Sequence, residues 1–520
     1  MEFTLRAFFW TKWPSISRKR RGPMTPRPDQ SSSLATKRNP AVDRYIERIL
    51  ARVEQLALHD EGIQRWAIDQ LIAEIDRHVG AVLDNILHHE DFARLEASWR
   101  GLDYAVRHID FSQNIELCWL NCSKAELSKD FAQVENMASS GLFRIIHSSD
   151  YGMFGGRPFS TVFLQFPFDH GKEDVVLLQR VAAVGAAAHV HVYVDAAPRL
   201  LGIDTFAAVP HMTAIEDVFN DGAHEEWNRF RDTAEARYLG VLLPRVQLRI
   251  PHRRAGKPVR ILAVDEHGDL VRDSRGNLLW TQTNPFVYQE RIRDHRDLLW
   301  GSPAYPLAVL FATHFATFRT SDDLFGTLDV PPPVTDHFPE LGPRFPKPPV
   351  DVLISHETTV TLARLGLQSV EFARWSSALQ FNIGVSLHKP PTFALHEGGE
   401  LATFEAWLGS MVSYTRIASR YVHYLKVMER ERIGANIGRL DIERELNEWI
   451  AQYVTSRSRI SAVQRRKFPL AYARVQTFDT NQEGVYRIEV KLRPHARVFG
   501  QLFELAAAWQ SSPAPGRRAA

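Results

Sequence analysis

The sequence predicts an α/β protein of several domains, in which a mixed β-sheet is covered by helices. Three observations support this fold class. Residues 40–110 carry long helical patterns, residues 111–252 alternate short apolar strand patterns with helical ones, and residues 401–507 contain helices followed by two strands. We therefore expect a helical N-terminal arm, and C-terminal helices followed by a β-hairpin. A chain of 520 residues has room for about three or four domains.

Changes in composition and periodicity divide the chain into six predicted regions. They are a disordered N-terminal tail at 1–39, a helical region at 40–110, an α/β domain at 111–252, a middle or outer region with an insertion and a proline-rich excursion at 253–400, a C-terminal helical and β-hairpin assembly region at 401–507, and a disordered tail at 508–520. The first tail is rich in Pro, Ser and Arg without a period, so it cannot bury a core. Its basic run at 17–21 is predicted to be solvated. Translation starts at either Met1 or Met24.

The elements before residue 111 are predicted to be three helices. Apolar residues recur every three or four positions at 42–56, at 63–87 and at 92–106. In the first of these segments, charged residues occupy the opposite face. Each helix is therefore expected to pack one apolar face against a neighbour.

The α/β domain is predicted from alternating strand and helix patterns. Ser123 and Glu126 form a capping box, which marks the start of a helix. A helical end closes at Gly240, and after an apolar run the segment 246–250 alternates apolar and polar residues, which predicts a half-buried strand with one polar face. The other predicted elements are strands at 115–119, 143–147, 161–166 and 190–194 and a helix at 175–188. Strands that alternate with helices indicate a partly parallel sheet.

The later part of the chain is predicted to be helical and then β. Two loop-rich stretches precede it: short strands joined by turns at 253–285, and a proline-rich surface excursion or boundary at 331–349. The predicted C-terminal elements are helices at 417–428 and 442–453, strands at 472–478 and 485–492, and a short helix at 499–505.

Three histidines are the first candidates for a metal site. His189 and His191 are two residues apart, so on a strand they would share a face and could bind a metal with His211. A metal site also needs partners that orient its ligands, and the order of the chain predicts none for these residues. We interpret them as structural histidines.

Two further clusters have simpler interpretations. His88 and His89 end a predicted helix, where cationic or capping side chains are favoured. Cys118 and Cys122 lack both the usual metal spacing and a second cysteine pair, so they are predicted to be buried thiols.

Glycine-rich and acidic loops are candidates for anion or calcium binding. The cluster from Gly152 to Gly156 precedes a strand rather than a helix, which favours a turn over a phosphate loop. The acidic stretches 265–269 and 273–277 lack the alternating aspartates of a calcium loop. Because no hydrolase, metalloprotease or nucleotide-binding motif occurs, we predict no catalytic residue, no metal, no cofactor and no enzymatic activity.

The composition favours an ordinary globular protein of a reducing compartment. Lys and Arg number 63 against 61 Asp and Glu, without the basic excess typical of nucleic-acid binding. Two cysteines cannot build a disulfide framework, which suits the cytoplasm. No apolar run approaches the length of a membrane span, and residues 1–13 lack the cleavage site of a signal peptide.

Several motifs in one order resemble the large subunit of the type VI secretion contractile sheath (the TssC/VipB family). The segment EARYLGVLLPRVQLRIPH at 235–252 resembles the family's link between two domains. The others are LEASWRGL at 95–102, SGL at 140–142, DYGMFGGRP at 150–158, LWGSPA at 299–304, HYLKV at 423–427, ERELN at 443–447 and LRPH at 492–495. The resemblance is dense over 62–250 and 400–505 and patchy between them. Two departures are Ser302, where the family usually has Asn, and the longer stretch at 253–285.

The resemblance implies a structural role in an assembly. In this family the large subunit pairs with a small sheath subunit (the TssB/VipA type), and the heterodimers stack into a helical tube in the cytoplasm around an inner tube of hexameric rings. Contraction of the sheath, which stands on a baseplate, drives the inner tube outward and delivers effectors. The alternatives are a sheath protein of a phage-derived contractile injection particle and, remotely, a metal-dependent enzyme.

The resemblance also implies strand exchange between neighbouring protomers, because an unpaired strand edge can pair with another chain. Carried onto this sequence, it points to two C-terminal strands. The residues predicted for this assembly role are Tyr472, Arg474, Gln476, Val485, Arg487, Ile488, Val490, Leu492 and Arg493. The simpler interpretation is a hairpin that packs on its own domain.

The family further implies an AAA+ ATPase that dismantles contracted sheaths. In related sheaths this ATPase binds an amphipathic helix near the start of the large subunit. Residues 1–39 show no such helix, and the helix predicted at 42–56 lies close to the body. We therefore expect that recycling is absent or that it uses the small subunit.

Overall fold

The computed structural model divides into two compact units. One comprises Met1–Trp13, Glu96–Arg249 and Trp300–Ala520, and the other Pro14–Leu95 and Ile250–Leu299. Apart from a few single positions, the structure describes residues 5–11, 65–148, 156–252, 260–262, 271–274, 279–282, 288–319, 329–337, 346–373, 377–381, 384–393, 409–431, 438–457, 467–480, 486–495 and 505–510.

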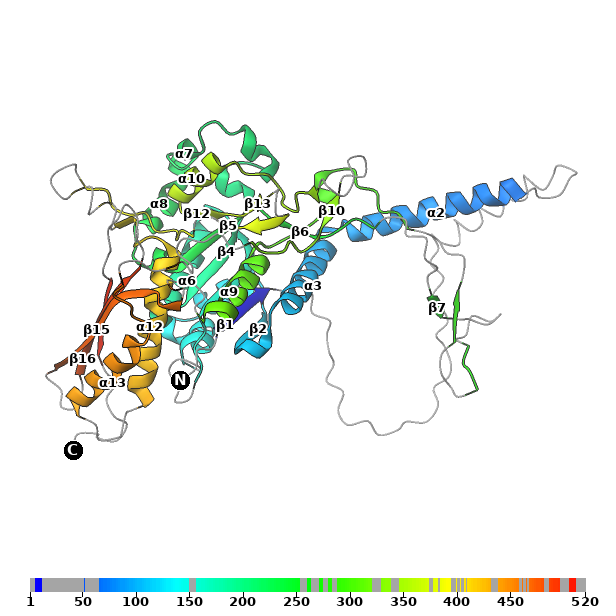
Figure 1. Ribbon diagram of the computed structural model, residues 1–520. Helices are drawn as coiled ribbons and strands as arrows, with labels where there is room; N and C mark the ends of the chain where they lie inside the picture. The colour runs from blue at the N-terminus through cyan, green and yellow to red at the C-terminus, as the bar shows by residue number, and fades with distance from the viewer. Residues whose placement is uncertain are drawn as a thin grey trace, which may run out of the picture. The chain divides into compact units, whose positions relative to one another are not determined.

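The first unit is built on a six-stranded sheet in which every neighbouring pair is parallel (Figure 1). The order is β12-β5-β4-β3-β1-β2. The strands are β1 (Leu5–Thr11), β2 (Ile115–Asn121), β3 (Thr161–Phe168), β4 (His191–Ala196), β5 (Leu239–Leu243) and β12 (Leu367–Ser369). The predicted α/β class is therefore confirmed, and the large sheet is parallel throughout these strands.

Strand β1 corrects the prediction of a disordered N-terminal tail. It lies between β2 and β3, and the backbone of Phe9 is in register with both Trp119 and Phe163. A strand that is paired on both edges gains its hydrogen bonds from distant segments, which the composition of 1–39 does not reveal. The rest of the predicted tail, and all but one residue of the helix predicted at 42–56, lie outside the described residues.

The two faces of the sheet carry different side chains, because successive residues of a strand point to opposite faces. Val162 and Val192 belong to the main hydrophobic core, which they share with α6 (Lys172–Ala188). On the other face, the rings of Phe163 and Tyr193 stack with centroids 5.5 Å apart, and both lie near Phe311 of α9 (Ala304–Phe318).

The strand predicted at 143–147 is wrong, because this segment is helical. It forms the end of α5 (Gly141–Phe143) and a π-helix at Arg144–Ser148. The Ser140 hydroxyl accepts a hydrogen bond from Phe143 N, and Asp130 accepts from two further amides. These caps satisfy the first amides of a helix and override the strand preference of Ile145 and Ile146.

Helices α3 (Glu90–His108, which begins in the second unit) and α4 (Lys124–Ala132) agree with the sequence, whereas the sequence pattern does not predict several shorter elements. The predicted capping box of Ser123 and Glu126 opens α4. The remaining helices and strands before the C-terminal region are α7 (Ile215–Val218), α8 (Glu225–Arg231), α10 (His356–Arg364), β10 (Asp336–His337), β11 (Pro346–Lys347), β13 (Glu371–Ala373) and β14 (Ala378–Gln380). Within the proline-rich stretch, β10 and β11 pair antiparallel.

The segment after residue 238 differs from the predicted half-buried strand. Gly240 lies inside β5, where an added Cβ would come within 2.6 Å of the Tyr193 ring. Every residue of β6 (Val246–Arg249) is buried, including Gln247 and Arg249. The polar side chains are buried because the first unit supplies partners, as Arg249 Nε lies 2.9 Å from Glu96 Oε1. Strand β6 pairs with β9 (Leu299–Gly301).

The second unit contains α2 (Arg65–Leu87), where the sequence predicts a helix, together with β7 (Arg260–Leu262) and β8 (Trp280–Gln282). The two strands pair antiparallel, in line with the short strands predicted there. Asp84 on α2 is buried and accepts hydrogen bonds from Tyr288 OH and Arg291 N.

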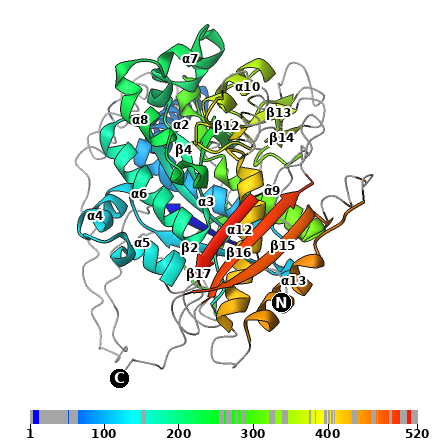
Figure 2. The same ribbon diagram turned by 90° about the vertical axis from the view of Figure 1, so that its left-hand side faces the viewer.

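The C-terminal region contains α12 (Val412–Glu431), α13 (Arg439–Ala451) and an antiparallel sheet of β15 (Leu470–Asp479), β16 (Tyr486–Pro494) and β17 (Leu505–Gln510). Figure 2 shows this sheet lying over α12. Residues 499–504 of the predicted short helix and 511–520 of the predicted tail lie outside the described residues, whereas Leu505 and residues 508–510 belong to β17 instead. Alanine favours a helix locally, but pairing with β16 decides the outcome.

Candidate functional site

The outer edge of β15 is held by side chains of α13. Asn447 Oδ1 accepts from Val475 N at 2.9 Å, and its amide nitrogen donates to Val475 O at 2.8 Å. Glu443 accepts from Thr477 N at 2.8 Å, and Arg439 donates to Thr477 O at 2.6 Å. The backbone groups that a neighbouring strand would use at 475 and 477 are therefore occupied within the chain.

The start of the same edge is also occupied. Thr455 N donates to Leu470 O at 2.9 Å, and Leu470 N donates to Tyr453 O at 3.3 Å. Together with the contacts from α13, these bonds cover the edge of β15 near both 470 and 475–477. The three-stranded sheet thus has β17 as its other edge.

Most residues predicted for assembly lie in this sheet. Tyr472, Arg474 and Gln476 are on β15, and Arg487, Ile488, Val490, Leu492 and Arg493 are on β16, whereas Val485 lies outside the described residues. Strand β16 is central, so its backbone pairs on both sides within one chain. The sequence pattern identified two strands but missed the third, which forms the edge.

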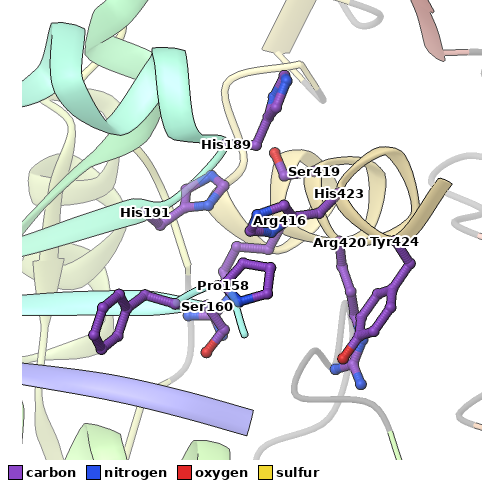
Figure 3. Close-up of a pocket in the computed structure, with 10 residues that line it drawn as sticks. Pro158, Ser160, His189, His191, Arg416, Ser419, Arg420, His423 and Tyr424 are labelled. Atoms are coloured by element: carbon purple, nitrogen blue, oxygen red, sulfur yellow. The ribbon is translucent and has the colours of Figure 1, made fainter. Parts of the chain in front are cut away.

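A small cavity of about 40 Å³ lies between α12 and the α/β body, by which we mean the six-stranded sheet and the segments that flank its strands (Figure 3). Figure 3 shows Arg416, Ser419, Arg420, His423 and Tyr424 projecting from α12, across from the side chains of the body. The body contributes Pro158, Phe159, Ser160, His189 and His191. The cavity therefore lies where two parts of the chain more than 200 residues apart meet.

The histidines of this region are neutral near pH 7. Burial, reinforced by the charges of Lys426 and His147, lowers the pKa of His189 to about 3. Burial is also the main reason why the pKa values of His191 and His423 lie well below the usual histidine value. Lys426 Nζ lies 2.8 Å from His189 Nε2, so the ammonium donates to the neutral ring. Burial lowers the pKa of Lys426 itself to about 8.

Arg416 is almost fully buried in the wall of the cavity. Its guanidinium carbon lies 3.7 Å from the centroid of the Phe311 ring, a cation–π distance, and Nη1 donates to Tyr193 OH at 3.4 Å. Next to this contact, the residue before Arg416 also reaches β4, because Thr415 Oγ1 lies 2.8 Å from His191 Nε2. These contacts anchor the first half of α12 to the sheet.

The structure separates the three candidate metal ligands. His189 and His191 line the same cavity, but His211 is exposed in a 3₁₀ helix at Phe206–His211. Within the described ranges, no three His, Cys, Asp or Glu residues group closely enough to hold a metal ion. His189 is hydrogen-bonded to Lys426 and Tyr238, and His191 to Thr415, and none of these three is a common zinc ligand.

The remaining candidates have local roles or lie outside the described residues. Cys118 and Cys122 form no disulfide and are only partly buried, which corrects the prediction of buried thiols. His88 Nε2 lies 3.0 Å from Glu290 Oε1 within the second unit. The glycine cluster, except Gly156, and most of the two acidic loops fall outside the described residues. Among the helices that are described, none is both long and apolar enough to cross a bilayer.

Comparisons with known proteins identify the family. Residues 69–285 match the family model "VipB: EvpB/VC_A0108, tail sheath N-terminal domain", and residues 401–508 match "VipB_2: EvpB/VC_A0108, tail sheath gpW/gp25-like domain". A relative is the type VI secretion system sheath protein TssC1 of Pseudomonas aeruginosa (strain PAO1). It is 26% identical over 487 residues, which cover 90% of this chain and 92% of that protein.

Two solved structures show weaker likeness. A chain of the anti-feeding prophage baseplate, solved by cryo-EM, has a TM-score of 0.33 at 9% identity, covering 80% of this chain and 78% of that one. The sheath tail protein Lin1278 from Listeria innocua has a TM-score of 0.31 at 10% identity, covering 68% and 57%. Likenesses at these TM-scores are too weak to support a conclusion.

The two family matches follow one another in the order of the sheath domains and together span more than half of the chain. The resemblance stated from the sequence motifs is thereby confirmed. This chain belongs to the VipB/EvpB family of tail sheath proteins, a structural family without enzymatic activity.

Proposed function

We propose that this protein is the large subunit of a type VI secretion contractile sheath and that it acts in the cytoplasm. The observation that carries the proposal is the pair of family matches in sheath order, at 69–285 and 401–508. The name of the P. aeruginosa relative, which is aligned over nearly its whole length, supports the type VI assignment over a phage-derived particle.

In this role the chain pairs with the small sheath subunit, and the heterodimers stack into a tube around the hexameric inner tube, above a baseplate. Contraction would need no bound nucleotide in the sheath. Interfaces that enlarge during the transition would release energy stored in the extended lattice, and the inner tube would be driven outward with its effectors.

We further propose that neighbouring protomers add a strand to the C-terminal sheet at β17. The backbone N–H and C=O groups of Val475 and Thr477 face α13. In an antiparallel pair the direction of these groups alternates along a strand, so Arg474 and Gln476 are the residues of β15 whose backbone groups hydrogen-bond to β16. The same alternation applies to β16. Its backbone groups face β17 at Ile488, Val490 and Leu492. The amides of Ala506 and Ala508 then face outward, at the edge opposite to the occupied one.

Co-expression with the small subunit, followed by electron microscopy, tests the proposed function. We expect hollow tubes from the pair, and aggregation or poor solubility of the large subunit alone, because an open strand edge pairs nonspecifically. A stable, monodisperse monomer that does not bind the small subunit would rule out the sheath role. Tubes formed without the small subunit would instead indicate a phage-derived type of sheath.

A further inference from the structure

The cavity beside α12 has a wall of positive and hydrogen-bond-donating groups. Arg416 and Arg420 line it from the helix, and Ser419 and Ser160 line it from opposite sides. Some of these donors also have partners in the chain, as Arg420 Nη2 donates to Arg319 O at 3.1 Å and Ser419 is bonded to Tyr238. Among the described residues that line the cavity, none is acidic. The side chains that surround this space can therefore donate hydrogen bonds to a negatively charged group.

The charged groups around the cavity are mainly basic. Burial has the largest effect on its three histidines, and each charged neighbour that also lowers their pKa values is basic. Beyond the lining, those basic neighbours include Lys426 and Arg430. An acidic neighbour, Glu429, raises the pKa of Lys426 and so acts in the opposite direction. The potential in this partly enclosed space is thus positive, and the low dielectric of its surroundings strengthens the attraction of an anion.

The volume restricts the class of ligand. A cavity of about 40 Å³ is large enough for a group the size of a few water molecules, and too small for a nucleotide or a sugar. Arginine guanidinium groups and serine hydroxyls suit tetrahedral or planar oxyanions, because they offer several N–H and O–H donors around one centre. We propose that this cavity is a binding site for one small oxyanion of the phosphate or sulfate class.

Such an anion would link two domains of the same chain. Ser160 and the two histidines belong to the part matched by the N-terminal sheath domain, and Arg416 to Tyr424 belong to the gpW/gp25-like domain. Bonds from both sides would hold α12 against the α/β body. This inference concerns one chain only, so it can fail while the proposed sheath role stands, and the reverse also holds.

Equilibrium dialysis with radiolabelled inorganic phosphate tests the site directly. The soluble full-length protein, alone or with its small subunit, is dialysed near pH 7.5 at constant ionic strength set with sodium chloride. We expect saturable binding of one phosphate per chain, competition by sulfate, and a rise in the midpoint of thermal unfolding as the site fills.

Two substitutions place a carboxylate in the cavity. Ser419→Asp and Ser160→Asp should each weaken phosphate binding by at least about tenfold, because a like charge would oppose the anion. Ser160 is partly exposed, so its variant is expected to fold even if the buried Ser419→Asp variant does not. The matched control is Ser128→Asp, which makes the same change at an exposed position of α4 and should bind phosphate normally.

Two results would overturn the proposal. One is the absence of saturable phosphate binding to the folded protein at concentrations up to about 10 mM, a range that includes weak sites. The other is binding, or thermal stabilisation by phosphate, that is the same in both cavity variants as in the Ser128→Asp control. The second result would mean that phosphate acts elsewhere or as a general stabilising salt.

Discussion

At the scale of single residues, the carboxyl of Asp195, a partly buried residue of β4, is bonded to one hydroxyl. Ser302 donates to Asp195 Oδ1 at 2.7 Å and accepts from Ala304 N at 3.0 Å, at the start of α9. Burial raises the pKa of Asp195 from 3.8 to about 7, and the bond from Ser302 opposes that rise. Ser302 therefore supplies a polar link between β4 and the start of α9.

We expect Asp195→Asn to change how stability depends on pH. Because the pKa of Asp195 is higher in the folded than in the unfolded chain, its contribution to stability is complete below about pH 4 and is lost as the pH rises through about 7. The variant keeps an oxygen that accepts from Ser302 and cannot ionise. At pH 7.5 it should be more stable than the wild type by on the order of 1–3 kcal/mol.

Thermal unfolding of both proteins at pH 4.5 and pH 7.5 measures this effect. The buried histidines titrate over the same range with the opposite sign, since their folded pKa values are lowered, but they do so in both proteins. The difference between variant and wild type therefore isolates Asp195. Equal differences at the two pH values would show that this carboxyl does not titrate in the range.

At the scale of elements, α3 and β6 are joined by a buried ion pair. Glu96 Oε1 lies 2.9 Å from Arg249 Nε and 2.7 Å from Arg100 Nε, and the side chains of Glu96 and Arg249 are 13% and 5% exposed. On the same helix, Asp103 and Arg107 form a pair at 2.8 Å whose side chains are 57% and 73% exposed. The helix thus offers a buried pair and an exposed pair for direct comparison.

Glu96→Ala should destabilise the protein far more than Asp103→Ala. Removing Glu96 takes a carboxylate away from a buried guanidinium, which costs about 3 kcal/mol. Removing Asp103 breaks an exposed pair that contributes about 0.5 kcal/mol or less. Urea denaturation of the two variants gives both values. Similar values would show that water reaches Arg249 as easily as Arg107.

At the scale of the whole molecule, the C-terminal sheet has two unequal edges. The edge at β15 is occupied by α13 and by residues 453–455, whereas β17 ends the sheet on the other side. A sheath needs contacts that repeat from one protomer to the next, and an open strand edge provides one. Growth at β17 is therefore the arrangement that we propose for this sheet.

Two proline substitutions separate the edges. Ala508→Pro removes an amide that faces outward on β17, and Ala473→Pro removes its counterpart on β15, so neither breaks a bond to β16. With the small subunit present, we expect Ala508→Pro to abolish long tubes in electron micrographs while the heterodimer still forms. Ala473→Pro should still give long tubes. The reverse pattern would place strand addition at β15.

The sequence by itself determined the elements whose signals are local. The capping box of Ser123 and Glu126, the helix around 175–188 and the strands at 161–166 and 472–478 depend on neighbouring residues, and each is present in the structure. The family was also recognisable, because its motifs are short and keep their order along the chain.

Only the tertiary structure decided the features that depend on distant partners. Strands β1 and β17 exist because β2, β3 and β16 supply their hydrogen bonds, and none of these partners can be read from the segments themselves. The burial of Arg249 requires a carboxylate to pair with its guanidinium, and this carboxylate comes from Glu96, 153 residues earlier in the chain. The cavity likewise forms only when α12 meets His189 and His191. Local periodicity records which face of an element is apolar, but hydrogen bonding and charge pairing are settled between segments that the fold brings together.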